Sequence, residues 1–195
     1  MEVTRKLEWD MGHRVPNHKS KCRNVHGHRY VAEITMEGDV VGDKGISDEG
    51  MVIDFGDIKT IAGNFIDENL DHGYMGNFDA DREILLMLSE MKLKTMAVHF
   101  IPTAENIAAW LFEKLSPLFE RTYQNSLRLK RIRLWETPNS YVDYELKTIV
   151  NAYQTDQPLT EANNNLVSAI STLHQETPLV KSEIPNIMAN ENPTH

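Results

Sequence analysis

The segment of residues 26–37, HGHRYVAEITME, alternates between two kinds of side chain over most of its length. Two histidines, a tyrosine and three apolar residues share one side, whereas an arginine, two glutamates and a threonine take the other. Successive side chains of a β-strand point to opposite faces, so this period of two predicts a half-buried strand. Such a strand needs strand partners and a second layer over its buried face.

Other segments carry the same kind of pattern. Residues 2–11 alternate loosely as a strand, and LRLKRIRLWE (127–136) alternates clearly. SYVDYEL (140–146) completes a hairpin with that strand around the turn TPNS. MVIDF (51–55) follows a segment rich in Gly and Asp and is typical of a short strand.

Helical periodicity marks three segments between these strands. Apolar residues at 58, 61, 62, 65 and 66 predict an amphipathic helix that ends near Leu70. Residues 81–97 carry a second stripe, which Pro102 ends, and Thr103 is a suitable N-cap for a third helix. The order strand, strand, helices, strand, strand predicts an α+β domain in which helices cover one face of a four-stranded antiparallel sheet.

The length and composition suit one domain with an extension. The chain has 195 residues and 41% hydrophobic content, which is typical of a globular protein. We expect the domain to span residues 1–148, because residues 149–195 contain no Arg, one Lys, five acidic residues and many Asn. This C-terminal segment is expected to be a flexible extension without catalytic chemistry.

Composition also limits the kind of partner. The chain has neither the run of about 20 apolar residues of a membrane span nor the hydrophobic region of a signal peptide. A formal net charge of −9 argues against a broad nucleic-acid surface. The single cysteine, Cys22, cannot form an internal disulfide and fits a reducing compartment. We therefore expect a cytoplasmic protein that binds neither membranes nor nucleic acid.

The stretch HKSKCRNVHGH (18–28) places a thiol close to two imidazoles. His26 and His28 lie two positions apart on a strand, so they project from one face and can chelate a metal ion. His13 can supply a third ligand if the first two strands pair. Three histidines with an open position are typical of catalytic zinc, whereas Cys22 as a fourth ligand would make a closed structural site. A thiol beside the metal would instead act as a base or nucleophile, and the spacing leaves both alternatives open.

The same region is basic within an acidic chain. Its basic cluster comprises His13, Arg14, His18, Lys19, Lys21 and Arg23. An anionic ligand would require such a local positive field, although a solvated basic loop has the same composition.

Six motifs follow one another along the chain: WDMGHR, CRNVHGH, MVIDFGDIK, LDHGYM, PTAENIA and WETPNS. Over about residues 5–146 they resemble the 6-pyruvoyltetrahydropterin synthase family. They are most similar to its bacterial and phage branch, the 6-carboxy-5,6,7,8-tetrahydropterin synthases of the queuosine and 7-deazaguanine pathway. The resemblance to this branch includes the cysteine four positions before HGH and the Asp-Phe pair at residues 54–55.

The resemblance implies the tunnelling fold (T-fold) and a zinc-dependent lyase. It implies His13, His26 and His28 as zinc ligands, Cys22 as the general base, and Asp71 with His72 as a proton-transferring pair. It also implies substrate contacts at Glu136, Thr103, Glu105, Asp54 and Phe55. A Lewis acid, a thiolate, a relay pair and a bidentate carboxylate together suit proton removal from a bound pterin.

The implied reaction is cleavage of a carbon–carbon and a carbon–oxygen bond. The substrate would be 7,8-dihydroneopterin triphosphate, and the products 6-carboxytetrahydropterin, acetaldehyde and triphosphate. Family members form trimers whose sheets close into a barrel and stack as hexamers, with sites at subunit boundaries. A homo-oligomer is therefore implied, and closure would remove exposed sheet edges.

Other interpretations of these residues stay open. A pyruvoyl-forming synthase would eliminate triphosphate instead, and a non-catalytic zinc protein would use Cys22 as a ligand. Asp71 could simply form a turn, and Glu136 could be a strand-end carboxylate. Thr103 and Glu105 could do no more than begin a helix.

The chain departs from the short members of the family in two places. A helical insert is expected near residues 79–100, between the LDH and PTAEN motifs, and the extension after residue 148 is additional. The sequence does not indicate what either segment does, nor whether the product serves tRNA or DNA modification.

Overall fold

The computed structural model describes residues 1–124 and 126–145. Its strands are β1 (Glu2–His13), β2 (His26–Gly38), β3 (Gly73–Asn77), β4 (Thr95–Val98), β5 (Leu127–Thr137) and β6 (Ser140–Glu145). Its helices are α1 (Phe55–Ile58), α2 (Asn64–Asn69), α3 (Arg82–Glu90) and α4 (Ala104–Tyr123). A 3-10 turn, η1 (Lys21–Arg23), precedes β2, and a π-helical turn, η2 (Lys59–Gly63), joins α1 to α2.

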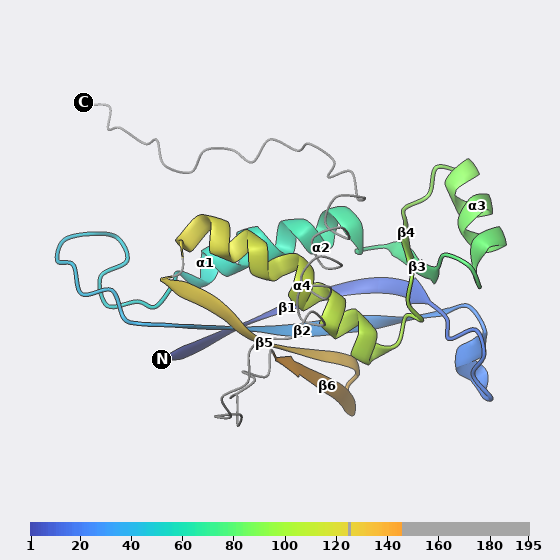
Figure 1. The fold of residues 1–195 in the computed structure, drawn as a ribbon, viewed down its shortest axis with the longest axis horizontal. Coiled ribbons are helices and arrows are strands. Elements are labelled where there is room, and N and C mark those ends of the chain that lie inside the picture. The colour runs from blue at the N-terminus through green and yellow to red at the C-terminus, as the bar shows by residue number, and fades with distance from the viewer. Residues whose placement is uncertain (125, 146–195) are drawn as a thin grey trace, which may run out of the picture. The chain divides into compact units, whose positions relative to one another are not determined.

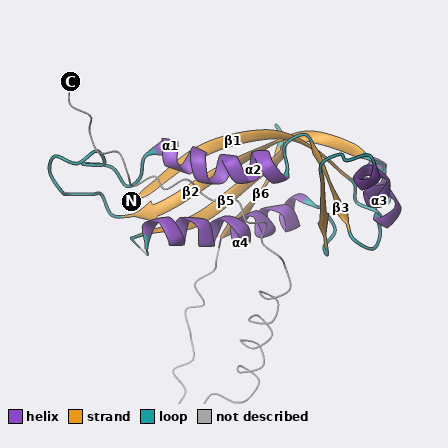
Figure 2. Ribbon diagram, turned by 90° about the horizontal axis from the view of Figure 1, so that it is seen from above, coloured by secondary structure: helices purple, strands orange, loops and turns teal. Residues whose placement is uncertain are grey.

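The sheet has the strand order β4-β3-β1-β2-β5-β6. The predicted antiparallel set of four strands is confirmed, because β2 pairs with both β1 and β5, and β5 pairs with β6. The predicted alternation in β2 is confirmed as well: Tyr30, Ala32, Ile34 and Met36 are fully buried. Helices α1, α2 and α4 lie over this buried face, so the α+β class is confirmed (Figures 1 and 2).

Two strands were missed, and the strand number four is therefore corrected to six. β3 pairs with the end of β1 in parallel register, and β4 pairs with β3, also in parallel. The helix predicted for residues 81–97 ends at Glu90, and residues 95–98 form β4. The segment near residues 79–100 is thus helix α3 followed by a strand, and both lie at one end of the sheet (Figure 1).

The short strand predicted at residues 51–55 is wrong. Val52 and Ile53 are buried, as their apolar character suggests, but they lie in irregular backbone. The cause is Asp54, whose carboxylate accepts a hydrogen bond from the backbone N–H of Gly56 at 2.6 Å. This N-cap begins α1 at Phe55 and ends the extended segment.

The helical layer supplies the other half of the core. The predicted helix ending near Leu70 is confirmed as the continuous run α1, η2 and α2. Thr103 caps α4 as predicted, since its hydroxyl accepts from the backbone N–H of Asn106 at 3.4 Å. The largest apolar side chains that α4 buries are Ile107, Leu111, Phe112, Leu115 and Phe119. Each contributes roughly 1.5–3 kcal/mol of transfer free energy.

The opposite face of the sheet is exposed and charged. Lys6 pairs with Glu33 at 3.3 Å, and Arg29 pairs with Asp10 at 2.7 Å. Exposed pairs of this kind contribute about 0–1 kcal/mol each, so this face gives little stability. None of the helices described in residues 1–124 and 126–145 could cross a membrane. The extension predicted at 149–195 lies outside the described residues.

Candidate metal centre and active-site cleft

The pairing of β1 with β2 brings three histidines together. His13 and His26 are direct partners in the ladder, and His28 lies two residues further on the same face. One ligand nitrogen from each lies within 4.8 Å of the others, so a single ion can contact all three. The ring centroids of His13 and His26 are 4.6 Å apart, and those of His26 and His28 are 5.0 Å apart. The sequence prediction thus identified a real cluster.

Hydrogen bonds orient two of these rings. His13 Nδ1 lies 2.7 Å from the carbonyl oxygen of Pro102, and His26 Nδ1 lies 2.8 Å from the carbonyl oxygen of Asn24. A carbonyl only accepts, so both Nδ1 atoms carry the proton, and each Nε2 offers a lone pair to a metal. His28 differs, because its Nε2 is buried with no hydrogen-bond partner among the described residues. A metal ligand bond would satisfy this nitrogen.

Burial favours the neutral form of two of these imidazoles, His13 and His28. Desolvation is the main cause that lowers the pKa of His13, which is 1% exposed, and it also lowers the pKa of His28. Glu136 Oε1 lies 3.5 Å from His13 Nε2 and opposes this shift, but it is the weaker influence. The contact with Glu136 is therefore not an ion pair. Neutral imidazole is the form that binds zinc, so the three histidines fit a three-nitrogen zinc site.

Cys22 lies beside this cluster without joining it. Its half-buried side chain is on η1 and lines a cleft of about 320 Å³ together with His13 and His26. Among the described residues, the group of candidate ligands contains the three histidines and omits Cys22. The backbone carbonyl of Cys22 accepts from the N–H of Val15 at 2.8 Å, which closes the loop that carries the thiol. This arrangement is typical of an open metal site with a neighbouring thiol rather than a closed four-ligand site.

Three predicted substrate contacts line the same cleft. Glu136 lies near the end of β5, and Thr103 and Glu105 lie at the start of α4. Thr103 also caps α4, so this residue both begins the helix and lines the cleft. Tyr30 connects the cluster to Glu136, because its hydroxyl lies 3.1 Å from His13 Nε2 and 3.4 Å from Glu136 Oε1. Burial raises the pKa of the Tyr30 hydroxyl, so it stays protonated.

The cleft also contains two residues that the sequence prediction did not select, Ser140 and Tyr141, and one, His18, that it placed only in the basic cluster. Ser140 and Tyr141 reach it from the start of β6, and Tyr141 packs against Trp135 at a centroid distance of 4.5 Å. His18, on the loop before Cys22, also lines the cleft. Its Nδ1 accepts a hydrogen bond from the backbone N–H of Ser20 at 3.1 Å. A neutral His18 therefore carries its proton on Nε2. The one feature of the sequence that could have indicated His18 as a residue of this cleft is its position four residues before Cys22.

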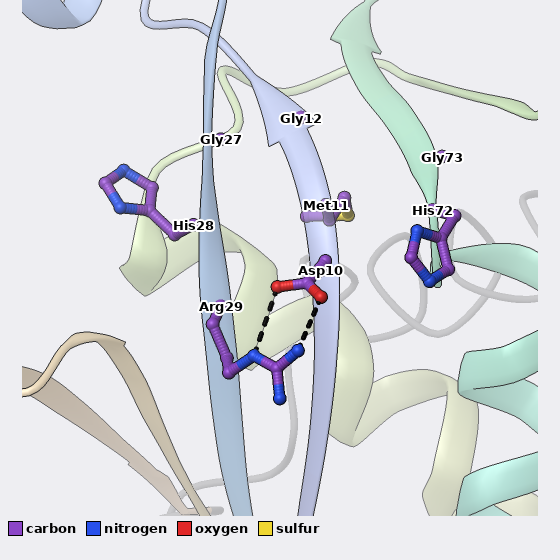
Figure 3. Close-up of a pocket in the computed structure, with 8 residues that line it drawn as sticks. All are labelled: Asp10, Met11, Gly12, Gly27, His28, Arg29, His72 and Gly73. Carbon is purple, nitrogen blue, oxygen red and sulfur yellow. Dashed lines mark hydrogen bonds and ion pairs between the residues drawn. The ribbon is translucent and has the colours of Figure 1, made fainter.

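His72 lies in a different cleft, next in the chain to Asp71. This second cleft, of about 410 Å³, is lined by Asp10, Met11, Gly12, Gly27, His28, Arg29, His72 and Gly73 (Figure 3). Asp10 and Arg29 form an ion pair across it, whereas His28 extends away from that pair (Figure 3). Cys22 does not line this second cleft, so the chain does not bring its thiol and its Asp71–His72 pair together in one cleft.

The backbone fixes Asp71 and His72 firmly. Asp71 Oδ1 accepts from the N–H of Asp10 at 3.0 Å, and the N–H of His72 donates to the Asp10 carbonyl at 2.7 Å. His72 has φ 56°, a left-handed conformation that is unfavourable for a residue with a side chain. Its ring is 78% exposed, and Nε2 lies 3.7 Å from Asp71 Oδ2, which is too long for a hydrogen bond.

Gly27 separates the two clefts at the histidine pair. A Cβ atom at this position would approach the carbonyl oxygen of Met11 to 3.0 Å. Any side chain here would push β1 away from β2, and with it His13 away from His26. The glycine between His26 and His28 therefore allows the close contact between β1 and β2 that keeps the three histidines together.

The basic cluster is not one surface. His13 is buried, and Arg14 forms an ion pair with the buried Asp81. Lys19, Lys21 and Arg23 remain exposed near the mouth of the Cys22 cleft.

Asp54 and Phe55 lie apart from these groups. They begin α1 and line neither cleft, and Phe55 is 47% exposed. Within one chain, the structure therefore does not bring these two predicted substrate contacts to the histidines.

Known proteins resemble this chain along the described domain. The family 6-pyruvoyl tetrahydropterin synthase matches residues 2–147. A 6-carboxy-5,6,7,8-tetrahydropterin synthase of Haemophilus influenzae is 34% identical over 146 residues, covering 74% of this chain and 98% of that protein. The enzyme of the same name from Rickettsia bellii is 40% identical over 145 residues, covering 73% of this chain and 99% of that protein.

Solved structures resemble the fold. An uncharacterized protein of Wolinella succinogenes has a TM-score of 0.59 at 22% identity, covering 75% of this chain and 98% of that chain. The 6-pyruvoyl tetrahydropterin synthase of Caenorhabditis elegans has a TM-score of 0.51 at 26% identity, with 75% and 96% covered. The predicted T-fold is confirmed by these neighbours.

Proposed function

Because this chain belongs to the 6-pyruvoyl tetrahydropterin synthase family, we propose that it is a zinc-dependent 6-carboxy-5,6,7,8-tetrahydropterin synthase. Its substrate is 7,8-dihydroneopterin triphosphate, and its products are 6-carboxytetrahydropterin, acetaldehyde and triphosphate. We place this product in queuosine and 7-deazaguanine biosynthesis. The observation that carries the proposal is the cluster of three histidines beside a thiol that is not one of its ligands.

The metal site consists of His13, His26 and His28. Zinc bound there supplies a Lewis acid that polarises a substrate oxygen. The protein holds His13 and His26 by their Nδ1 hydrogen bonds, so both rings present Nε2 in a fixed direction.

The thiolate of Cys22 acts as the general base. It lines the same cleft as two of the histidines, within reach of a substrate that occupies that cleft. The exposed cations of Lys19, Lys21 and Arg23 lie near the cleft mouth, where they attract the triphosphate group.

The pterin ring is oriented by Glu136. A carboxylate has two parallel acceptor oxygens, which match the adjacent N–H groups of a pterin edge. Thr103 and Glu105, from the first turn of α4, complete this side of the cleft. The contact from Tyr30 holds the Glu136 carboxylate toward the metal site.

Asp71 and His72 complete the site from a second copy of the chain. His72 lines a cleft that Cys22 does not reach within one chain, which supports a homo-oligomeric trimer or hexamer. In this assembly, His72 transfers a proton on the side of the substrate opposite Cys22, and the Asp71 carboxylate nearby stabilises its charged form. Asp54 and Phe55 contact substrate in the same way, from a neighbouring copy.

We assign the synthase to residues 1–148, with the segment of α3 and β4 as an insert and residues 149–195 as an extension. A free Cys22 thiol needs a reducing compartment, so we place the enzyme in the cytoplasm.

The test is to incubate the zinc-loaded protein with 7,8-dihydroneopterin triphosphate and identify the products. Release of acetaldehyde with a 6-carboxypterin supports the proposal. A diketo product with triphosphate and without acetaldehyde would assign the chain to pyruvoyl formation instead. Absence of any turnover in a zinc-containing oligomer would leave a non-catalytic zinc protein.

A further inference from the structure

Arg14 directly follows the zinc ligand His13, and its guanidinium joins three segments of the chain. Its Nε donates to Asp81 Oδ1, and its Nη2 donates to the carbonyl oxygen of Ala80 at 2.9 Å. Its Nη1 lies 3.5 Å from the carbonyl oxygen of Arg23, the residue next to Cys22. One side chain thus contacts the turn before α3 and the end of the loop that carries the thiol.

The turn that Arg14 contacts is itself rigid. The side chain of Asp81 is 0% exposed, and its Oδ2 accepts from the N–H of Asn77 at 2.8 Å. The Asn77 side-chain oxygen accepts from the N–H of Ala80, also at 2.8 Å. Arg14 is therefore attached to a fixed point, whereas residues 17, 19–21 and 23–25 of the cysteine loop are exposed.

We propose that Arg14 is a positioning residue that ties the Cys22 loop to the turn before α3. The proposal rests on the proposed function, in which the Cys22 thiol is the base. The loop carries few buried apolar groups, so its position depends on hydrogen bonds such as Val15 N–H to Cys22 C=O. The segment that contains α3 is accordingly part of the active-site framework.

The chemistry of the pair favours arginine at this position. A buried carboxylate requires a partner, and any cation could supply charge. Only a planar guanidinium, however, can direct separate N–H groups at a carboxylate and at two carbonyls. Lysine keeps the charge and cannot make all three contacts, so Arg14→Lys separates positioning from charge.

The experiment measures how fast iodoacetamide modifies Cys22, in the full-length zinc-loaded protein. Cys22 is the chain's one cysteine, so modification reports on this loop alone. The variants are Arg14→Lys and the double variant Arg14→Gln with Asp81→Asn, which leaves no unpaired buried charge. The matched control is Arg128→Gln on β5, which breaks the exposed ion pair with Glu37 on β2.

We expect both Arg14 variants to be modified about two- to fivefold faster than the wild type, the ratio expected for loss of one hydrogen bond of ordinary net strength. kcat should fall by a similar ratio with KM little changed, and the zinc content and the Arg128→Gln rate should match the wild type. A wild-type modification rate in folded variants overturns the proposal, as does a rate increase that follows loss of zinc. The modification rate does not depend on turnover, so a wild type without synthase activity would refute the proposed function and leave this inference standing.

Discussion

The two clefts beside β1 and β2 differ in how much of their chemistry one chain completes. In the Cys22 cleft, His13 is buried and its ring is fixed by Pro102, and together with His26 and with His28 from the second cleft it forms, within one chain, a cluster that could hold a metal ion. In the second cleft, the His72 ring is 78% exposed and makes no side-chain hydrogen bond with Asp71. Within one chain, the three proposed metal ligands are already brought together. The His72 side chain of the proposed proton-transfer pair is instead left exposed to solvent.

The largest effect is expected for Cys22→Ala. Loss of a general base should lower kcat by about 10²–10⁴-fold. Zinc content should stay at the wild-type level, because the metal group contains three histidines and not the thiol. Steady-state kinetics and metal analysis of the same preparation check this. Loss of zinc along with activity would instead make Cys22 a ligand.

His72→Ala should lower kcat by about 10²-fold, since it removes a proton-transfer group and leaves the histidine cluster intact. Mixing it with Cys22→Ala under conditions that exchange subunits should restore activity. If each site takes Cys22 from one copy and His72 from another, roughly a quarter of the sites regain both in an equal mixture. No recovery in verified mixed oligomers would show that the two residues act within one chain.

The free energy of unfolding should depend on pH because His13 is buried. Burial lowers the pKa of His13 below its ordinary value of 6.5, so below pH 6.5 the unfolded chain binds a proton that the folded chain does not. Stability of the metal-free protein is thus fully present above pH 6.5 and falls as the pH decreases toward the folded pKa, by at most about 1.4 kcal/mol per pH unit. Urea unfolding between pH 5 and pH 7.5 measures this slope. An unchanged slope in His13→Gln would contradict the assignment.

Tyr30→Phe should have the smallest effect. It removes the hydroxyl that lies between His13 and Glu136, which are held by backbone and strand contacts as well. Loss of one hydrogen bond of about 1 kcal/mol should raise KM about fivefold with kcat nearly unchanged. Tyr144→Phe, on an outer strand, is the matched control. A large fall in kcat would instead indicate that the hydroxyl takes part in proton transfer.

The sequence predicted the Cys22 cleft better than the second cleft. The alternation from His26 to Met36 fixes which face His26 and His28 share, and pairing with the first strand then brings in His13. Thr103 was predictable because capping and helical periodicity act locally. Strand alternation and helix capping each involve only a few neighbouring residues, so they can be recognised from the local sequence.

The parts that were missed depend on long-range contacts. β3 contains two glycines and no alternation, and it forms because its backbone pairs with β1. Asp81 meets Arg14 across 67 residues, a partnership that neither local sequence indicates. Asp71 and His72 were selected by resemblance, and no local pattern indicates that Asp10 holds them. In each case a partner distant along the chain decides the structure.

Strand β1 contributes to both groups of residues. Asp10 holds the backbone of His72 and the side chain of Asp71, and His13, three residues further on, belongs to the histidine cluster. A displacement of this strand along its axis changes the ligand geometry of its own copy and the relay that the copy offers to its neighbour. In the proposed oligomer, this strand would connect the histidine cluster of one copy with the Asp71–His72 pair that the same copy offers to its neighbour.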